Sequence, residues 1–501
     1  MADIASALSD GVLSGRALLP HVAETHTGLV ILIGEFAYKV KKPVTTDFLD
    51  FSTPASRESA CAHEVTLNRR LAPASYLGVG HFESPRGDAP EPVIVMRRHP
   101  DECRLATMVR RGDDVRPQLA AVAETLAVFH RTAHRGPEVD DEARPQTVTA
   151  RWQENLAELA RYAAGVVPGL DPQIVSEIQR RAISFITGRE ELFNRRIAER
   201  RIVDGHADLL ADDIFCLPDG PALLDCLEFD DRLRYVDAVD DAAFLAMDLE
   251  FLGRQDLGDY FLGRYLASSG DDAAESLRHF YIAYRAVVRA KVECVRYTQG
   301  HAESAADARR HLGIACSHLR TATVRLIMVG GGPGTGKTTV ARALAERIGA
   351  EVISTDDVRA AMAARGEICG RPGVLGEGLY TRENIDAVYA AVLHHAQRGL
   401  GQGRTVVLDG TWSDPHYRDR ARGLAADAAA ATVELVCVAP LEATVGRIRT
   451  RTHTTSQVTA EIATELAGCE HETWPQAHRI DTTRPDAEAS AEALDICLTT
   501  S

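Results

Sequence analysis

A glycine-rich stretch in the second half of the chain has the residue types and spacing that phosphate binding requires. Its letters, GGPGTGKT, fit the pattern G-x-x-x-x-G-K-[ST] and lie between an apolar run at 324–329 and a helical pattern. Glycines let successive backbone N–H groups converge on phosphate oxygens, and a helix N-terminus adds its dipole. We expect Lys337 to act as a catalytic cation on the β- and γ-phosphates of ATP, and the Thr338 hydroxyl to bind Mg²⁺. The nucleotide-binding residues predicted for this loop are Gly331, Gly332, Pro333, Gly334, Thr335, Gly336, Lys337, Thr338 and Thr339.

Two carboxylates follow apolar runs, where the strands of a parallel sheet would present them near this loop. Asp409 ends the run TVVLD, a position that serves the metal site in phosphate-loop proteins. Asp356 follows VIST at the start of a helical pattern, and Arg359, three residues later, shares its helix face. A carboxylate at 356 can act as the catalytic group that accepts a substrate hydroxyl proton, while the arginine holds a substrate phosphate. A helix N-cap is the alternative role for Asp356.

The D-x-x-R pair resembles that of the small-molecule and polynucleotide kinase branch of phosphate-loop proteins, where such a pair follows the second strand. The resemblance implies a lid that carries arginines. Arg447, Arg449 and Arg451 in GRIRTRTHTT are similar to that lid, and we assign Arg447 and Arg451 to nucleotide binding. A solvated helix face is the alternative for these arginines.

An Asp-rich stretch in the first half of the chain carries a second set of candidate residues. The letters HADLLADDI at 206–214 resemble the H-G-D-x-x-x-x-N catalytic loop of aminoglycoside phosphotransferases and related protein-kinase-like enzymes. This resemblance implies that Asp208 is the catalytic aspartate and that Asp213 binds metal. It also implies a second metal ligand at Asp225, twelve residues later, after the apolar run in LLDCLEF.

Three positions of this loop depart from the family pattern. Asp213 stands where the family has Asn, Ala207 replaces Gly, and Leu210 stands where many members have a second His. An aspartate at 213 keeps an oxygen ligand for Mg²⁺, so we expect metal binding to survive. The loop is therefore expected to be active though altered, and a degenerate regulatory lobe is the alternative.

The segment FAYKV, upstream, resembles the strand that carries the phosphate-binding lysine in the same family. Strand alternation places Lys39 and Lys41 on one face, so Lys39 is the predicted nucleotide-binding lysine and Lys41 its rival. Glu64 in AHEVTLNRRLA is the predicted partner that orients the lysine, and Glu58 is a weaker candidate.

A local basic face occurs in YRAVVRAK, where Arg285 and Arg289 lie one helical turn apart. In an acidic chain this face would suit a phosphorylated or acidic substrate, and a solvated surface is the alternative. A cationic aminoglycoside would be poorly served by it, so the family resemblance does not identify the substrate.

Composition sets the wider limits. The chain has 501 residues, 45% hydrophobic and 26% charged, which is typical of a globular protein with room for two or three domains. Its net charge of −16 disfavours nucleic acid and acidic membrane surfaces as partners. No apolar run approaches the ~18–20 residues of a membrane span, and the first twenty residues do not resemble a secretory signal. Ten cysteines without a CxxC pair suit reduced thiols, so we expect a cytoplasmic location.

The elements that must position these residues form two groups. Two β-branched runs around 34–35 predict a hairpin, a mostly helical pattern covers 115–300, and strands and helices alternate after 324. We predict an α/β chain of two domains. Residues 1–320 would form a protein-kinase-like bilobal α+β domain, and residues 321–501 a P-loop NTP-binding domain with a parallel sheet.

These residues together predict an ATP- and Mg²⁺-dependent phosphotransferase that transfers the γ-phosphoryl group to a hydroxyl of a small molecule. An ATP-binding regulatory switch with slow ATPase activity is the first alternative. A polynucleotide 5′-hydroxyl kinase is the second, because it fits Asp356 and Arg359, although the acidic charge balance disfavours it. The sequence leaves the substrate and any protein partner open.

Overall fold

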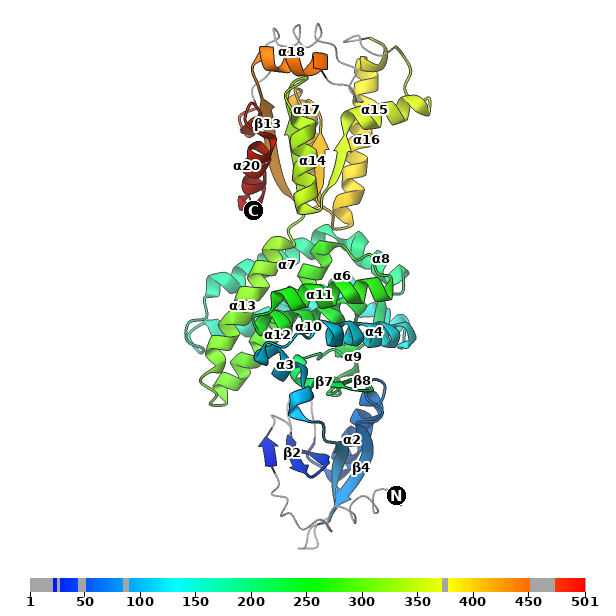
Figure 1. Ribbon diagram of the computed structural model, residues 1–501, viewed down its shortest axis with the longest axis vertical. Coiled ribbons are helices and arrows are strands. Elements are labelled where there is room, and N and C mark those ends of the chain that lie inside the picture. The colour runs from blue at the N-terminus through cyan, green and yellow to red at the C-terminus, as the bar shows by residue number, and fades with distance from the viewer. Residues whose placement is uncertain are drawn as a thin grey trace.

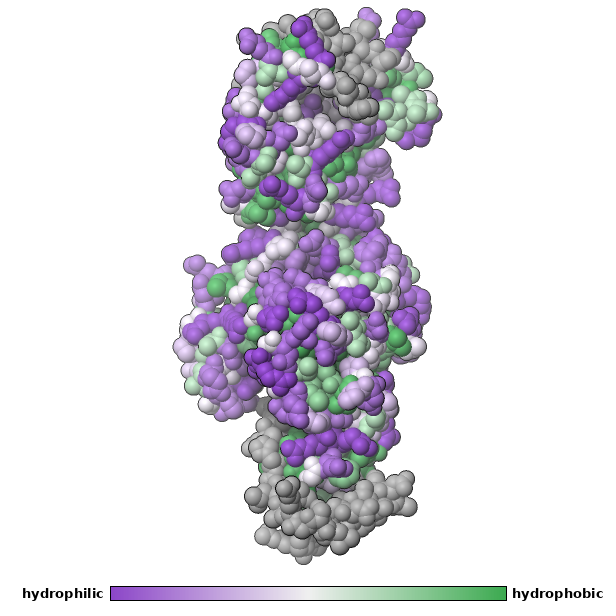
Figure 2. Space-filling view, viewed as in Figure 1, coloured by the Kyte–Doolittle hydropathy of each residue, from purple (hydrophilic) through white to green (hydrophobic). Residues whose placement is uncertain are grey.

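The computed structural model describes residues 21–24, 28–43, 51–83, 90–371, 377–450 and 474–500. A small β-rich lobe, a larger helical lobe and a parallel-sheet domain follow one another along the long axis (Figure 1). The molecule narrows where the helical lobe meets the parallel-sheet domain, as the space-filling view shows (Figure 2). The two ends of the described chain therefore lie in different bodies, with the helical lobe between them.

The small lobe is a five-stranded antiparallel sheet of order β1-β2-β3-β5-β4 with helix α2 packed on it. Its elements are β1 (His21–Glu24), β2 (Gly28–Ile33), β3 (Phe36–Lys41), α2 (Pro54–Asn68), β4 (Tyr76–Phe82) and β5 (Glu91–Arg97). The predicted hairpin is present, and Gly34 in its turn has a φ of 57° that glycine tolerates. Residues 37, 39 and 41 of β3 are buried, as strand alternation requires.

The helical lobe is built around α10, a helix that is buried on almost every side and contacts α11, α12 and α13. Its helices are α3 (Leu105–Arg111), α4 (Arg116–Thr132), α5 (Pro137–Asp141), α6 (Pro145–Ala163), α7 (Pro172–Gly188), α8 (Glu190–Ala198), α9 (Asp231–Arg234), α10 (Ala238–Phe251), α11 (Gln255–Ser269), α12 (Glu275–Thr298) and α13 (Ser304–Thr321). Two small antiparallel pairs complete it: β6 (Ile202–Asp204) with β9 (Tyr235–Asp237), and β7 (Ile214–Leu217) with β8 (Gly220–Leu223). The Asp-rich stretch lies among these short strands, below the helical core.

The third body is a five-stranded parallel sheet of order β11-β12-β10-β13-β14. Its strands are β10 (Arg325–Gly330), β11 (Glu351–Ser354), β12 (Val406–Asp409), β13 (Ala431–Val438) and β14 (His478–Asp481). Its helices are α14 (Lys337–Ile348), α15 (Thr355–Ala364), α16 (Arg382–Gly401), α17 (Pro415–Asp427), α18 (Leu441–Thr450) and α20 (Asp486–Thr499). Separate apolar clusters cover the two faces of the sheet, which explains why its strands are continuous apolar runs.

This architecture confirms the predicted fold class of a bilobal α+β domain followed by a P-loop domain with a parallel sheet. None of the helices that the structure describes is both long enough and apolar enough to cross a membrane.

The helical lobe contacts the parallel-sheet domain through residues that precede the strands of the sheet. Arg189 is buried, and its Nη1 donates to the carbonyl oxygens of Ala428 (2.9 Å) and Ala429 (3.1 Å), just before β13. The Ser276 hydroxyl donates 2.6 Å to the carbonyl oxygen of Gly403, just before β12. The joint therefore covers the amino edge of the sheet and leaves its carboxyl edge, where the glycine-rich loop lies, facing away (Figure 1).

Gly188 offers a test of this joint, because a Cβ there would lie 2.1 Å from the Ala428 carbonyl oxygen. We expect Gly188→Ala to destabilise the chain by about 1–3 kcal/mol through overpacking, seen as a lower Tm in calorimetry. Gly423→Ala is the matched control, since Gly423 is an exposed helical glycine with nothing within 4 Å of its Cβ position. It should be neutral or stabilising by up to about 1 kcal/mol. Equal Tm values for the two variants would contradict the close joint.

Candidate functional site

The glycine-rich loop connects β10 to α14 and has the backbone that its sequence predicts. Gly331, Gly334 and Gly336 have φ values of 139°, 76° and 85°, in the region that favours glycine. At Gly334 a Cβ would lie 2.7 Å from the Thr444 carbonyl oxygen, so a larger residue does not fit. Gly336 is the N-cap of α14, and the first amides of that helix lie at the loop without helical acceptors. The loop therefore offers the backbone donors that an anion needs.

Thr338 and Asp409 meet beside this loop because β12 pairs with β10. The Thr338 hydroxyl donates 2.8 Å to Asp409 Oδ2. Asp409 is 2% exposed, and its Oδ1 has no hydrogen-bond partner among the described residues. Burial raises the pKa of Asp409, opposed by the charge of Lys337 and the bond from Thr338. A hydroxyl and a spare carboxylate oxygen at a phosphate loop suit Mg²⁺ and its bound water, so these residues fit the predicted metal.

Asp356 and Arg359 lie on α15 at the same edge of the sheet. Arg359 Nη1 donates 2.8 Å to Asp356 Oδ1, and the guanidinium lies 4.6 Å from the centroid of the Tyr380 ring. Ser354 is the N-cap of α15, since its hydroxyl accepts from the Asp356 N–H at 3.3 Å. The expected shared face is confirmed and the N-cap alternative for Asp356 is wrong. The roles of both side chains toward a substrate stay predictions.

The predicted lid is described only in part. Arg447 on α18 lies at the loop, where its Nη2 donates 2.6 Å to the Thr482 carbonyl oxygen and its Nη1 lies 3.4 Å from that of Gly334. Arg451 lies outside the described residues. Thr482, whose hydroxyl also donates 2.6 Å to the Thr335 carbonyl oxygen, supports the loop from β14 and was not foreseen from the sequence. It follows the last strand by one residue, where an isolated threonine gives no signal.

Two buried lysines of β3 share one buried glutamate in the small lobe. Lys39 lies 2.8 Å from Glu64 Oε1, and Lys41 lies 2.5 Å from Glu64 Oε2. Glu64 is completely buried, whereas Glu58 pairs with His81 at an exposed position. Glu64 is therefore the lysine partner, as the sequence predicted, and the weaker candidate Glu58 is wrong.

The second contact of each lysine separates their roles. Lys39 lies 2.6 Å from Asp225 Oδ1, and Lys41 lies 2.6 Å from Glu228 Oε1. The two partners differ in exposure: the Asp225 side chain is 45% exposed, whereas that of Glu228 is 15% exposed. The Lys41 side chain itself is only 1% exposed. Burial alone would lower the pKa of Lys39, but the charges of Asp225 and Glu64 raise it well above its usual value. Lys39 thus remains a fixed cation beside the predicted metal ligand, and Lys41 is an interior counter-charge.

The three aspartates assigned from the family resemblance lie close enough to influence one another. Burial raises the pKa of Asp208 to about 6, opposed by Arg289 and increased by Asp225. Burial and the charges of Asp225 and Asp208 raise the pKa of Asp213 well above its usual value. Partial loss of contact with water would raise the pKa of Asp225, but the charge and the hydrogen bond of Lys39 outweigh this effect and lower that pKa. No three His, Cys, Asp or Glu side chains of the described residues are grouped around one metal position, but Asp213 and Asp225 offer carboxylate oxygens near Lys39, which fits a magnesium ion that would also bind phosphate oxygens and water.

The loop that carries Asp208 is held in place by Asp241 of α10. Asp241 is completely buried, and its oxygens accept from the N–H groups of His206 and Ala207, both at 2.7 Å. His130 Nε2 lies 2.9 Å from the same carboxylate. Burial would raise the pKa of Asp241, but the bond and charge of His130 lower it below its usual range. Ala207 has a φ of 66°, so the alanine in place of the family glycine sits in a left-handed conformation that costs about 1–2 kcal/mol.

Residues at the end of α2 and just after it bind the loop that carries Asp208 and the Asp225 segment from the side of the small lobe. Arg70 Nη2 donates 2.9 Å to the Gly205 carbonyl oxygen, and the Cys226 N–H donates 2.9 Å to Asn68 Oδ1. The Asp225 N–H lies 3.2 Å from the Tyr76 hydroxyl. The loop that carries Asp208 and the Asp225 segment are thus both fixed to the lobe that carries the lysines.

Arg285 does not form the predicted substrate-binding face. It is 4% exposed and makes two bonds of 2.7 and 2.8 Å to Asp240, with a third contact of 3.3 Å to the Ala207 carbonyl oxygen. The assignment of Arg285 to substrate is therefore corrected: the arginine supports the loop from inside the helical core. Helical spacing placed it beside Arg289 but could not show that α10 covers it.

Arg289 lies near enough to Asp208 for its positive charge to lower the pKa of that aspartate. It pairs with Glu293 at 3.3 Å, and Glu293 Oε2 is buried without a hydrogen-bond partner in the described residues. His311 stacks on Phe251 at 4.0 Å. Arg289 thus keeps a position compatible with the predicted role toward a substrate, which stays a prediction.

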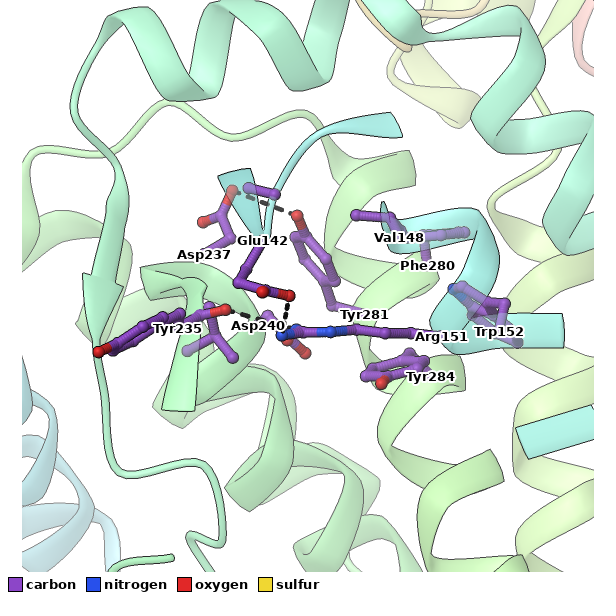
Figure 3. Close-up of a pocket in the computed structure, with 12 residues that line it drawn as sticks. Glu142, Val148, Arg151, Trp152, Tyr235, Asp237, Asp240, Phe280, Tyr281 and Tyr284 are labelled. Atoms are coloured by element: carbon purple, nitrogen blue, oxygen red, sulfur yellow. Dashed lines mark hydrogen bonds and ion pairs between the residues drawn. The ribbon is translucent and has the colours of Figure 1, made fainter. Parts of the chain in front are cut away.

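A hollow behind this network is too small for a substrate. It is lined by Glu142, Arg151 and Asp240, among others, and encloses about 20 Å³, room for roughly one water molecule. Arg151 points toward Glu142, at 2.8 Å, and the Tyr281 hydroxyl toward Asp237, at 3.3 Å (Figure 3). The hollow is therefore part of the packing that supports the loop.

Known proteins resemble the chain in three ways. Residues 326–470 match the family model described as AAA domain. The uncharacterized protein Rv2004c of Mycobacterium tuberculosis (strain ATCC 25618 / H37Rv) is 55% identical over 475 residues, 95% of each chain. Two solved structures have low overall similarity. A sugar kinase from Janibacter sp. HTCC2649 is 20% identical with a TM-score of 0.28, over 35% of this chain and 94% of that one. The GDP and kanamycin complex of APH(2")-IIia is 14% identical with a TM-score of 0.39, over 63% of this chain and 99% of that one.

The buried His311 of α13, which stacks on Phe251 of α10, gives a test of how these two helices pack. Burial, with the charges of Arg289 and Arg310, lowers its pKa to about 3. The unfolded chain binds a proton at this histidine below its unfolded pKa of about 6.5, whereas the folded chain binds one only near pH 3. The free energy of unfolding therefore has its full value above pH ~6.5 and decreases as the pH falls from there toward 3. Between pH 7 and pH 5 we expect the wild type to lose about 2 kcal/mol more unfolding free energy than His311→Phe, measured by urea titration. His395→Phe, at an exposed position of α16, should follow the wild type. Identical pH dependence in His311→Phe would refute the buried neutral histidine.

Proposed function

We infer that this chain, which belongs to the family of the mycobacterial proteins that match 95% of it, is an ATP-dependent phosphotransferase. It pairs a protein-kinase-like domain with a P-loop kinase domain. The acceptor that we propose is a hydroxyl of a small molecule. Membranes and nucleic acid are not the proposed partners, because a net charge of −16 opposes acidic surfaces.

One observation carries the proposal for the P-loop domain. Thr338 and Asp409 meet at the phosphate loop, and the carboxylate of Asp356 lies at the same edge of the sheet without a capping role. Lys337 would stabilise negative charge on the phosphoryl group during transfer, and Asp356 would orient the attacking hydroxyl and accept its proton. Mg²⁺, when bound, would neutralise the charge between the phosphates.

The first domain supports the same chemistry with different residues. Lys39, fixed by Glu64, would hold nucleotide phosphates, and Asp225 and Asp213 would share the metal. Asp208 has a pKa of about 6, close to neutral pH, which suits a general base for the acceptor hydroxyl.

The test uses γ-labelled ATP with a metabolite extract and mass analysis of any labelled product. Asp208→Asn and Asp356→Asn each remove one predicted base and keep the side-chain shape, so each should abolish the products of one domain only. The intact chain should give labelled hydroxyl esters. Slow release of inorganic phosphate alone, unchanged by either variant, would refute the proposal in favour of an ATP-binding switch.

The two lysines of β3 should respond differently to removal. Lys39→Met should lower phosphoryl transfer by the first domain about 10²-fold or more, because the cation nearest Asp225 is lost. Lys41→Met should act mainly on stability, by about 3–5 kcal/mol, since it leaves the largely buried Glu228 without its lysine and Glu64 with Lys39 alone.

Labelled-product assays and circular dichroism, at a temperature where both variants are folded, measure these two effects. A folded Lys41→Met variant as inactive as Lys39→Met would contradict the separate roles.

A further inference from the structure

A second, larger hollow opens on the helical lobe, away from both predicted nucleotide sites. It encloses about 390 Å³, within the roughly 300–1,000 Å³ of small-molecule sites. Its walls come from the end of α4, the segment after α8, and α11. Four arginines line it, and the floor contains His130 and Tyr265; the arginines are Arg131, Arg135, Arg200 and Arg201.

Three of these arginines have no carboxylate partner within the described part of the chain. Arg131 and Arg200 are exposed, and no ion pair or side-chain hydrogen bond neutralises either of them. Arg135 is half-buried and donates only to carbonyl oxygens, including 2.6 Å to His130 and 2.9 Å to Arg200. Burial lowers the pKa of Arg135, and the charge of Arg200 lowers it further.

The fourth arginine is only weakly compensated. Arg201 Nη1 lies 3.8 Å from Asp271 Oδ2, but Asp271 already accepts two bonds of 2.6 and 2.8 Å from Arg196. Arg201 Nε is buried without a hydrogen-bond partner in the described residues. Glu199 at the rim lies 3.8 Å from Arg195. The hollow therefore holds an excess of positive charge in a chain whose net charge is −16.

The backbone of Arg200, in the wall of the hollow, is strained, and a hydrogen bond from Arg135 holds it in that conformation. Arg200 has a φ of 57°, unfavourable for a residue with a side chain, and its carbonyl oxygen accepts from Arg135 Nε at 2.9 Å. Strain of this kind persists where the surrounding structure fixes it, and it clusters at binding sites. The bond to Arg135 supplies that constraint.

The floor of the hollow is linked to the catalytic loop by consecutive hydrogen bonds. The Tyr265 hydroxyl lies 2.7 Å from His130 Nδ1, and His130 Nε2 lies 2.9 Å from Asp241. Asp241 in turn accepts from the N–H groups of His206 and Ala207. Any contact that immobilises the α4 end therefore acts on the residues that hold the loop.

We propose that this hollow binds the phosphate group of a phosphorylated small molecule and that the bound anion steadies the catalytic loop. A phosphate offers several charged oxygens, and guanidinium groups bind such oxygens in pairs. The recess is bounded by three elements, so it suits a small molecule rather than an extended polymer. Binding does not depend on the proposed function, whereas an effect on phosphoryl transfer would rest on it.

Equilibrium binding to the full chain tests the site, with ADP and Mg²⁺ present to fill the nucleotide sites. The probes are inorganic phosphate and glucose 6-phosphate, which separate the free ion from an organic phosphate. We expect Arg131→Gln/Arg200→Gln to weaken binding of the preferred probe at least about tenfold. Arg161→Gln/Arg180→Gln, at exposed positions of α6 and α7, changes the net charge equally and should bind as the wild type does.

Unchanged affinity in Arg131→Gln/Arg200→Gln, or no binding of either probe by the wild type, would overturn the site. Because the two exposed arginines contact neither nucleotide site, phosphate held by the P-loop would not respond to their removal, so the two failures are distinguishable. Hydrogen exchange at His206 and Ala207 tests the second half of the proposal. The preferred probe should slow it in the wild type; binding without this protection would overturn the steadying effect.

Discussion

The buried carboxylate of Asp241 is the interaction on which the first domain depends. A buried charge is costly unless donors surround it, and here two backbone amides and His130 do so. These donors belong to α4 and to the loop that carries Asp208, so the requirement to satisfy one anion fixes the position of both. The left-handed Ala207 is held in place by the same bonds.

A second constraint is the balance of charge where β3 and α2 of the small lobe meet the Asp225 segment. Two lysines and the carboxylates of Glu64, Asp225 and Glu228 form a connected cluster, so neither lysine can be considered alone. Pairing of this kind lets the small lobe keep charged groups away from water at a tolerable cost. In the P-loop domain the corresponding balance is simpler, since a neutral hydroxyl and one carboxylate meet beside a single lysine.

Sequence patterns predicted what depends on spacing within one element. The glycine-rich loop, the shared face of Asp356 and Arg359, and the alternation of Lys39 and Lys41 are of this kind, and so is the alternation of strands and helices after 324. Tertiary partners were harder to predict. Arg285 has the spacing of an exposed basic face, yet Asp240, 45 residues earlier, neutralises it inside the core.

His130 illustrates the same limit. It lies 111 residues from Asp241 along the chain, in a helix whose pattern gives no reason to single it out. Only the packing of α11 against both α4 and α10 brings the two together. Local periodicity tells which residues share a face, but it does not tell which other element will cover that face.

The direction of the parallel sheet has a consequence for how the two domains can cooperate. The helical lobe contacts the residues that precede the strands, so the P-loop lies at the edge of the sheet that faces away from the helical lobe and the small lobe (Figure 1). The two predicted nucleotide sites therefore lie in different bodies, with the helical lobe between them, so a compound passing from one to the other would have to cross solvent. Fusion into one polypeptide does guarantee an equal copy number of the two domains.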